Sequence, residues 1–307
     1  MLEAQNPQVQ DPQVAARYQF SHETTYRYSG EVTFGPHKLV LRPRENHLVR
    51  LEHFELQTWP PARIQWSEDI LGNIIATASF DKGGEELRFR SEFVVEKMEH
   101  AGNPQAESRV LTESPPYYLG IEEGASYLFR RSVFPTEVEA VRDWVFGLKI
   151  LPPQGQKAAI IDELTGLINQ QISYQRREEA GVQTPRQTLK KGTGSCRDTA
   201  VLLMEAARSL GFAARFVSGY LESQNSQVGK GSTHAWVEVY LPDHGWMGFD
   251  PSIGRQIGRG HVAVATSYHP RGIMPLSGKF SGNGHRYLGM EVAISSKKLT
   301  DGSAELG

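Results

Sequence analysis

The sequence predicts an α+β fold in which an N-terminal antiparallel β-sandwich precedes a domain of mixed helices and strands. Short runs of alternating aromatic and β-branched residues, broken by glycine-containing turns, fill residues 17–98. Runs of this kind are typical of sandwich strands. Apolar residues at helical spacing dominate the chain from residue 136 onward, and strand patterns return after Thr233. The spacing of apolar residues thus changes from the alternation of strands to the spacing of helices, and this change marks the boundary between the two domains.

These patterns divide the 307 residues into four segments. Residues 1–16 are rich in Gln, Pro and Asn and are expected to form a disordered tail. Residues 17–98 form the predicted sandwich, residues 99–135 a polar connector that contains proline, and residues 136–307 the second domain. A chain of this length can bury a sizeable core in two domains.

The first domain consists of short strands with turn signals between them. The predicted strands are 18–28, 51–58, 74–80 and 87–95. The histidines of this part lack the spacing of metal ligands; they are His22, His37, His47 and His53. We therefore expect no catalytic constellation in this domain.

The second domain begins with helical patterns and continues with strands. Apolar spacing predicts helices through residues 141–148 and 160–168 and another that begins at Cys196. Strands are predicted at 234–241, 245–250, 261–265 and 287–294. The sequence contains no internal repeat.

Cys196 is the single cysteine of the chain and stands at the predicted start of a helix. Ser195 and Asp198 have the spacing of a capping box, which makes Cys196 the first helical residue. Unpaired backbone N–H groups and the helix dipole favour the thiolate there over the thiol. A small buried hydrophobic residue is the alternative, but such a cysteine belongs on the apolar stripe of the helix and not at its glycine-flanked entrance.

A histidine and an aspartate follow Cys196 at the ends of two predicted strands. His234 begins the alternating segment HAWVEVYL, and Asp250 ends GWMGFD immediately before Pro251. Each alone is more often an ordinary polar residue at a strand end. Together with Cys196 they suggest a nucleophile, a base and a carboxylate that orients the base.

Residues 190–252 resemble the core of the transglutaminase-like superfamily of cysteine enzymes. The resemblance rests on GSCRDTAVLLMEAARSLGFAARFVSGYL and THAWVEVYLPDHGWMGFDPS. It implies a papain-like, transglutaminase-like core in which the cysteine helix packs on an antiparallel sheet. It also implies Cys196 as nucleophile, His234 as base and Asp250 as the residue that orients the histidine.

The oxyanion hole is less strongly marked in the sequence. The backbone N–H of Cys196 is a natural donor in such a fold. Tyr174, in a place where the family often has an aromatic residue, is a second candidate donor, with a packed aromatic residue as the equal alternative.

The resemblance also covers residues 18–98, which look like the N-terminal domain of one bacterial branch of the superfamily. YQFSHETTYRYSGEVTFGPHKLVLRPR and DILGNIIATASF carry it. The chain departs from that branch after the core, where Ser267 and the Pro270-Arg271-Gly272 insertion replace acidic positions. If this loop borders the cleft, substrate preference is expected to differ from that of relatives.

Composition limits the function further. The net charge is −2 with acidic and basic residues mixed, which gives no electrostatic footprint for nucleic acid. One cysteine excludes a disulfide framework and a cysteine-based zinc site. Neither a membrane span nor a signal peptide is predicted, so we expect a cytoplasmic location, with no cofactor and no metal.

The leading functional hypothesis is a cysteine-dependent peptidase or amidase that acts on a peptide or protein amide through a thioester. A transglutaminase, which transfers the acyl group to an amine, requires the same three residues. A non-catalytic binding or scaffold protein on the same fold is the third possibility, and the loss of one of the three residues would favour it.

Overall fold

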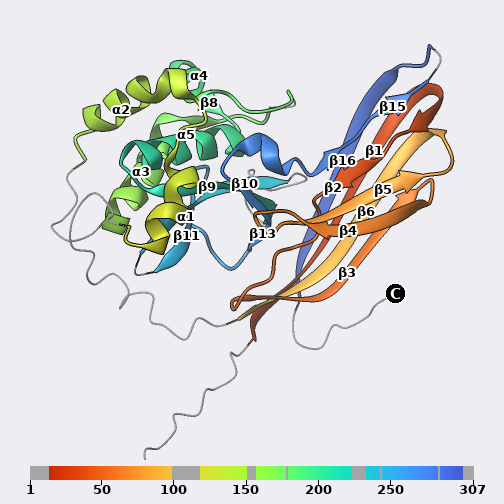
Figure 1. Ribbon diagram of the computed structural model, residues 1–307, viewed down its shortest axis with the longest axis horizontal. Coiled ribbons are helices and arrows are strands. Elements are labelled where there is room, and N and C mark those ends of the chain that lie inside the picture. The colour runs from red at the N-terminus through yellow and green to blue at the C-terminus, as the bar shows by residue number, and fades with distance from the viewer. Residues whose placement is uncertain are drawn as a thin grey trace, which may run out of the picture.

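The computed structural model describes residues 14–98, 118–150, 157–177, 179–222, 233–242, 244–282 and 284–299. It has two halves that lie side by side, with the helices gathered in one half and long strands in the other (Figure 1). Within the described residues, no helix is long and apolar enough to span a membrane.

The strand-rich half is a sandwich of two antiparallel sheets. One sheet has the order β15-β1-β6-β3, with β16 also paired to β1. Its strands are β1 (Val14–Phe34), β3 (Val49–Trp59), β6 (Gly84–Met98), β15 (Phe280–Ser281) and β16 (Tyr287–Leu299). The other sheet has the order β14-β2-β5-β4. Its strands are β2 (His37–Leu39), β4 (Ala62–Glu68), β5 (Ile74–Phe80) and β14 (Leu276–Ser277).

Alternation of side chains explains how this sandwich holds together. Along β1, buried and exposed residues alternate for most of its length, as expected for a strand with one face in a core. Phe34, Leu87 and Phe89 lie in the apolar cluster between the sheets. Burial of such large apolar side chains supplies most of the favourable free energy of folding.

The helix-rich half contains a third antiparallel sheet, with the order β12-β11-β10-β9-β13. Its strands are β9 (Ala213–Leu221), β10 (His234–Leu241), β11 (Gly245–Asp250), β12 (Arg255–Gln256) and β13 (His261–Ser267). The helices are α1 (Ile121–Arg130), α2 (Val138–Gly147), α3 (Lys157–Gln171), α4 (Pro185–Lys191) and α5 (Cys196–Ser209), with short 3-10 turns η1 (Pro135–Glu137) and η2 (Pro270–Ile273). The short strands β7 (Ser173–Tyr174) and β8 (Thr193–Gly194) form a small parallel ladder.

Helix α5 is the centre of this half. Its residues from Ala200 to Met204 have no measurable exposure, and Ala206 and Ala207 are equally buried. A helix that is apolar on all sides requires cover on all sides. The sheet lies on one side of α5, and α2, α3 and α4 contact it elsewhere.

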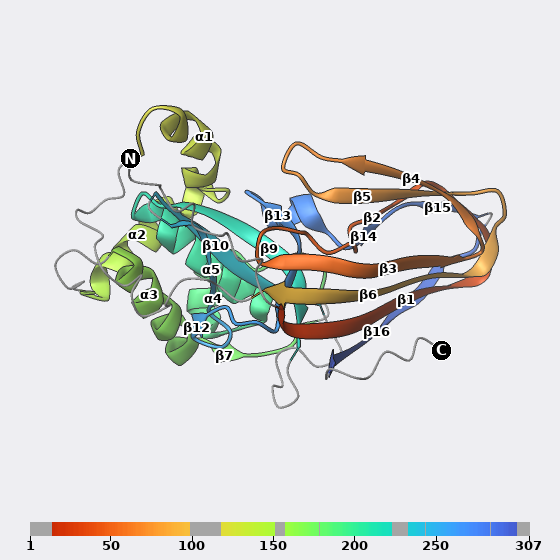
Figure 2. The ribbon, with the colours of Figure 1, turned by 90° about the horizontal axis from the view of Figure 1, so that it is seen from below.

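The two halves are packed against each other (Figure 2). Tyr220 of β9 contacts the rings of Phe20 and Phe93 in the sandwich, with centroid distances of 5.5 and 5.3 Å. The buried amide of Asn73 donates to the carbonyl of Thr266 at 2.9 Å and accepts from its N–H at 2.8 Å. One apolar core therefore runs from the sandwich into the helical half.

The predicted α+β class and its two parts are confirmed, but the segments differ in detail. The predicted second domain extended to residue 307, whereas β14, β15 and β16 pair with sandwich strands. Alternation along 287–294 identifies a strand and its faces, but it does not determine which strand edge is free to receive it.

Two further expectations meet the structure only in part. The connector predicted at 99–135 contains helix α1, and its residues 99–117 lie outside the described part of the chain. Of the predicted tail 1–16, residues 1–13 also lie outside it, and β1 already begins at Val14.

Candidate active site

The start of α5 places Cys196 in the cleft that His234 also lines. Gly192 ends α4 in the left-handed conformation, with φ of 64°, which glycine adopts without steric cost. The chain then forms β8 and reaches Ser195, the N-cap residue of α5. Asp198 accepts hydrogen bonds from the backbone N–H and the hydroxyl of Ser195, both at 2.8 Å. This local network fixes the backbone on which Cys196 stands.

Asp198 is itself held from a second direction. Its carboxylate accepts from the guanidinium of Arg177 at 2.7 Å and from the backbone N–H of Gln183 at 2.7 Å. Burial alone would raise the pKa of Asp198, but these donors and Ser195 hold it below its usual value. The carboxylate near the helix N-terminus is therefore ionised and bound on several sides.

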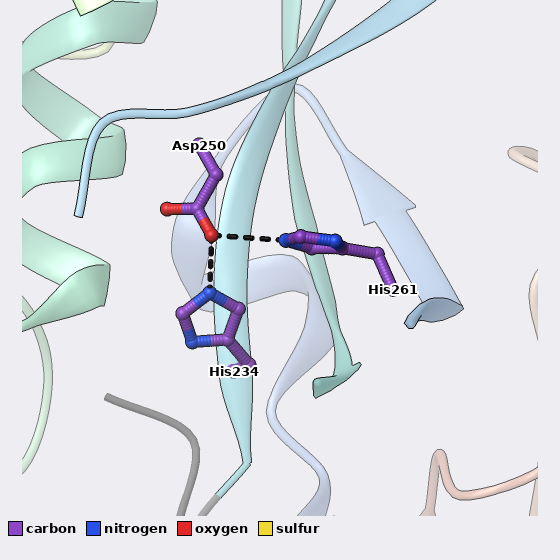
Figure 3. A group of neighbouring side chains, drawn as sticks. All are labelled: His234, Asp250 and His261. Carbon is purple, nitrogen blue, oxygen red and sulfur yellow. Dashed lines mark hydrogen bonds and ion pairs between the residues drawn. The ribbon is translucent and has the colours of Figure 1, made fainter. Parts of the chain in front are cut away.

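His234 and Asp250 come together at one end of neighbouring strands, as Figure 3 shows. His234 is the first residue of β10 and Asp250 the last of β11, and these strands pair antiparallel. The Nε2 atom of His234 lies 2.6 Å from the Oδ2 atom of Asp250. Since Nε2 faces Asp250, Nδ1 is the ring nitrogen left to interact with Cys196, which lines the same cleft.

The protonation states of His234 and Asp250 depend on each other and on Cys196. Burial alone would lower the pKa of His234, but the hydrogen bonds to Asp250 and Cys196 and the charges of these groups raise it well above the usual value. Burial would likewise raise the pKa of Asp250, but the two histidines that face it hold it far below the usual value. The arrangement therefore favours an imidazolium between a carboxylate and a sulfur.

A second histidine, His261 at the start of β13, shares the same carboxylate. Its Nε2 lies 3.0 Å from Oδ2 of Asp250, and its Nδ1 accepts from the backbone N–H of Gly258 at 3.1 Å. Burial is the largest effect on the pKa of His261 and lowers it. His261 is therefore the neutral tautomer that donates from Nε2. In the sequence, His261 is recognisable only as the start of a predicted strand.

The other oxygen of Asp250 is also bound. Its Oδ1 accepts from the backbone N–H of Ser252 at 2.9 Å and from the Ser252 hydroxyl at 2.6 Å. Asp250 has no exposed surface. A buried carboxylate with this many donors has one possible orientation, and that orientation determines the direction of the His234 ring.

His234, Asp250 and His261 are also residue types that bind metals, with ligand atoms within 4.8 Å of one another. Their separations of 2.6 and 3.0 Å are hydrogen-bond distances. Two ligands of one tetrahedral zinc ion would lie about 3.3 Å apart, given metal–ligand distances near 2 Å. The present geometry therefore fits a hydrogen-bonded network better than a closed metal site.

Tyr174 lies in the same cleft as Cys196. It pairs with Gly194 through the β7–β8 ladder, two residues before the cysteine. Burial raises the pKa of Tyr174 and the charge of Cys196 raises it further, so its hydroxyl keeps its proton. A protonated hydroxyl in this cleft is able to donate to an oxyanion, and this role remains a prediction.

Cys196 and His234 open into a cleft of about 520 Å³ between the two halves of the molecule. The helical half supplies its floor and one side, including Tyr174, Phe216 and the loop at 270–275. Strand β16 of the sandwich supplies the opposite wall through Tyr287, Met290 and Val292. The loop that departs from the bacterial branch thus borders the cleft, which meets the condition under which a different substrate preference is expected.

Comparison with known families now accounts for both halves. Residues 149–251 match the family model described as the transglutaminase-like superfamily. Residues 18–96 match the bacterial transglutaminase-like N-terminal region. The chain thus joins a bacterial transglutaminase-like N-terminal region to a transglutaminase-like core. The transglutaminase-like core carries Cys196, His234 and Asp250, whereas the N-terminal region contributes packing and, through its partner strand β16, part of the cleft.

Relatives of similar length are similar to this chain over most of their sequence. An uncharacterized protein of Mycobacterium tuberculosis is 25% identical over 274 residues, covering 85% of this chain and 87% of that protein. An uncharacterized protein of Mycobacterium leprae is 25% identical over 285 residues, covering 91% and 98%. Among solved structures, a candidate cysteine protease from Cytophaga hutchinsonii superimposes with a TM-score of 0.67 at 17% identity, covering 92% of this chain and 90% of that one. That structure shares the fold.

Proposed function

We propose that this protein is a cysteine-dependent amide hydrolase that acts on a peptide or protein substrate through a thioester. One observation carries the proposal. The imidazole of His234, almost completely buried, is held by Asp250, and it lines together with Cys196 a cleft large enough for a peptide segment. Nucleophilic thiol catalysis requires this combination.

In the proposed reaction, the Cys196 thiolate attacks the carbonyl carbon of the amide and forms the carbon–sulfur bond. The backbone N–H of Cys196 and the Tyr174 hydroxyl donate to the oxygen as it becomes negative. The His234 imidazolium then gives its proton to the amide nitrogen, the carbon–nitrogen bond breaks, and an amine leaves. Cys196 is left as a thioester and His234 as a neutral base.

Water completes the cycle. His234 takes a proton from a water molecule, whose oxygen attacks the thioester carbonyl, and the carbon–sulfur bond breaks. The acid leaves, and the thiolate–imidazolium pair is restored. If an amine replaces the water molecule, the same steps give a new amide, which is the transglutaminase reaction.

Trapping of the acyl-enzyme tests the proposal. The intact protein is incubated with peptide and isopeptide libraries, and mass spectrometry is used to detect an acyl adduct on Cys196. We expect an adduct with the wild type and none with Cys196→Ala. Added cadaverine then distinguishes the acceptors, because release of the free acid supports the hydrolase and release of the cadaverine amide supports the transferase. Absence of any adduct on a protein whose Cys196 still reacts with iodoacetamide would refute both.

A further inference from the structure

The cleft beside Cys196 has an excess of positive charge. Four arginines line it, namely Arg176, Arg177, Arg197 and Arg271. Among the described residues that line the cleft, none is Asp or Glu. The chain as a whole carries a net charge of −2, so the excess belongs to this place and not to the composition. Arginine is the side chain best suited to bind a carboxylate.

Two of the four arginines serve mainly to build the site. Arg177 donates to the buried Asp198 at 2.7 Å and lies 3.5 Å from the exposed Glu179. Arg197 donates to the backbone carbonyl oxygens of Arg177 and Glu179, at 3.0 and 3.3 Å. These contacts hold the loop that follows Tyr174 against the start of α5.

The other two arginines are free to meet a ligand. Arg176 and Arg271 are exposed, and within the described part of the chain neither side chain forms a hydrogen bond or an ion pair. Arg176 lies on the loop beside Tyr174, whose pKa its charge lowers slightly against the larger effect of burial. An arginine without a carboxylate in a cleft beside a nucleophile is a candidate for substrate recognition.

The turn that carries Arg271 is held rigidly. Pro270 and Ile273 are buried on either side of Arg271, and the Nδ1 atom of His269 accepts from the Arg271 backbone N–H at 3.1 Å. A Cβ atom at Gly272 would lie 2.4 Å from the Ser267 hydroxyl, so the turn requires glycine for its close approach to β13. The guanidinium therefore projects from a fixed base into the cleft.

Apolar side chains complete the surroundings. Met274 on the same loop and Tyr287 and Met290 on β16 line the cleft and are about half exposed, at 49%, 47% and 52%. They offer contact for the carbon chain of a ligand, while the arginines offer contact for its charge.

We propose that the acyl donor of this enzyme bears a carboxylate close to the reacting carbonyl, bound by Arg271 and Arg176, as in a peptide that contains glutamate. This inference rests on the proposed function, because it names the substrate class of the same cleft. The carboxylate belongs either to a glutamate side chain in an α-linked peptide or to the free α-carboxylate of a γ-linked one. Both present the same charge at a similar distance from the carbonyl.

Matched thioesters separate these cases. The probes are the α-benzyl thioester of N-acetylglutamate, its γ-thioester isomer, and the counterpart of each in which the free carboxylate is replaced by a carboxamide. In each acylation the Cys196 sulfur forms a bond to the carbonyl carbon, and benzylthiolate leaves and takes a proton. Its release gives kcat/KM, and intact mass spectrometry identifies the adduct.

We expect at least one acidic thioester to acylate the wild type with a kcat/KM about tenfold or more above that of its neutral counterpart. Arg271→Gln should bring this ratio close to one, Arg176→Gln should lower it, and Arg271→Lys should retain part of it. Arg142→Gln is the matched control, because Arg142 is exposed on α2 and does not line the cleft. The ratio should also fall as salt is added.

The outcomes are distinguishable from those of the proposed function. A preference for the α isomer supports glutamate side chains, and a preference for the γ isomer supports γ-linked chains. Equal rates for acidic and neutral thioesters, or a ratio that Arg271→Gln leaves unchanged, would overturn the substrate class while the hydrolase stands. Failure of every thioester to acylate a Cys196 that still reacts with iodoacetamide would overturn this inference, and the peptide and isopeptide libraries would then decide separately on the hydrolase.

Discussion

His22 in the sandwich and His234 in the transglutaminase-like core are buried to the same degree, each with 2% of its surface exposed. Burial lowers the pKa of His22 to about 4, so this histidine is neutral. His234 is subject to the same effect of burial, yet its pKa is raised. The two residue environments therefore differ in their neighbours and not in their access to water.

The neighbours of His22 are hydroxyl groups. Its Nδ1 lies 2.8 Å from the hydroxyl of Tyr220 and its Nε2 lies 2.9 Å from that of Thr24. A hydroxyl group donates or accepts equally well, so it satisfies a neutral ring without attracting a proton. His234 faces Asp250 and Cys196, which can both be anionic. The comparison shows that burial sets a cost for charge and that the partners decide whether the charge forms.

Replacement of the carboxylate gives the largest expected effect. Asp250→Asn removes the charge that stabilises the His234 imidazolium and changes the preferred tautomer of the ring. We expect acylation of Cys196 to slow by a factor on the order of 10⁴ while the fold is kept. Single-turnover kinetics measure this, with circular dichroism as the check on folding. Asp162→Asn, which changes an aspartate that contacts Gln256 outside the cleft, should remain near wild type. A rate for Asp250→Asn within tenfold of wild type would assign the orienting role to another residue.

Acid should destabilise the folded protein through His22. The pKa of His22 is about 4 in the folded protein and about 6.5 in the unfolded chain, so the unfolded chain binds more protons between these values. Stability should therefore fall as the pH falls from 6.5 to 4, by about 3 kcal/mol from this residue. His37 and His261 also have lowered pKa values, so the measurement is the difference between wild type and His22→Gln in urea unfolding. Parallel pH curves for the two proteins would contradict the assignment.

His234 should show the opposite dependence. Because its folded pKa is raised, its contribution to stability is complete below about pH 6.5 and is lost as the pH rises toward the folded value. The contribution of Asp250, whose pKa is lowered, is complete above about pH 4 and is lost in strong acid. The difference in unfolding free energy between wild type and His234→Gln should therefore shrink as the pH rises from 6.5 to 9. A constant difference would argue against a charged His234.

Replacement of His261 should reduce kcat less than replacement of Asp250 reduces the rate of acylation. His261→Gln keeps a side-chain N–H group in this region but loses the fixed direction of the ring. We expect kcat to fall about tenfold with little change in KM, in line with the loss of one charge-assisted hydrogen bond to Asp250. The accompanying shift in the pH profile of kcat distinguishes positioning of His234 from a purely structural role. An unchanged kcat would make His261 dispensable for the reaction.

The smallest effect is expected at the junction of the two halves. Tyr220→Phe removes the hydrogen bond to His22 and leaves the aromatic contacts with Phe20 and Phe93. We expect a loss of about 1 kcal/mol in unfolding free energy and an unchanged rate of Cys196 alkylation by iodoacetamide. A large fall in that rate would show that the junction acts directly on the chemistry.

Much of the fold and part of the site follow from local sequence. The capping-box spacing of Ser195 and Asp198 places Cys196 at a helix entrance, and alternation places His234 and Asp250 at strand ends. These are short-range patterns, which a single sequence displays. The two-domain division follows from the change in period between the strand-rich and helix-rich parts.

The remaining features depend on long-range pairing. His261 reaches Asp250 because β13 pairs with β9 and because an irregularity between Ala263 and Ala265 shifts its register. A strand pattern shows which side chains share a face, but it does not show which neighbouring strand they meet. For the same reason the sequence placed residues 287–294 in the second domain, although the free edge of β1 receives them. The proposed role of Arg271 in binding a carboxylate likewise cannot be inferred from sequence, because β16 forms part of the cleft that Arg271 lines.

The pairing of β16 with β1 also bears on the order in which the molecule is made. β1 is the first strand of the described chain to be synthesised, and β16 is the last. The sandwich sheet that contains β1 therefore still lacks β15 and β16 while the core around α5 is already able to fold. Since Tyr287, Met290 and Val292 of β16 form one wall of the cleft, the pocket beside Cys196 stays unfinished until β16 has been made. The strand that completes the sandwich sheet thus also completes the substrate pocket, so both depend on the same segment of the chain.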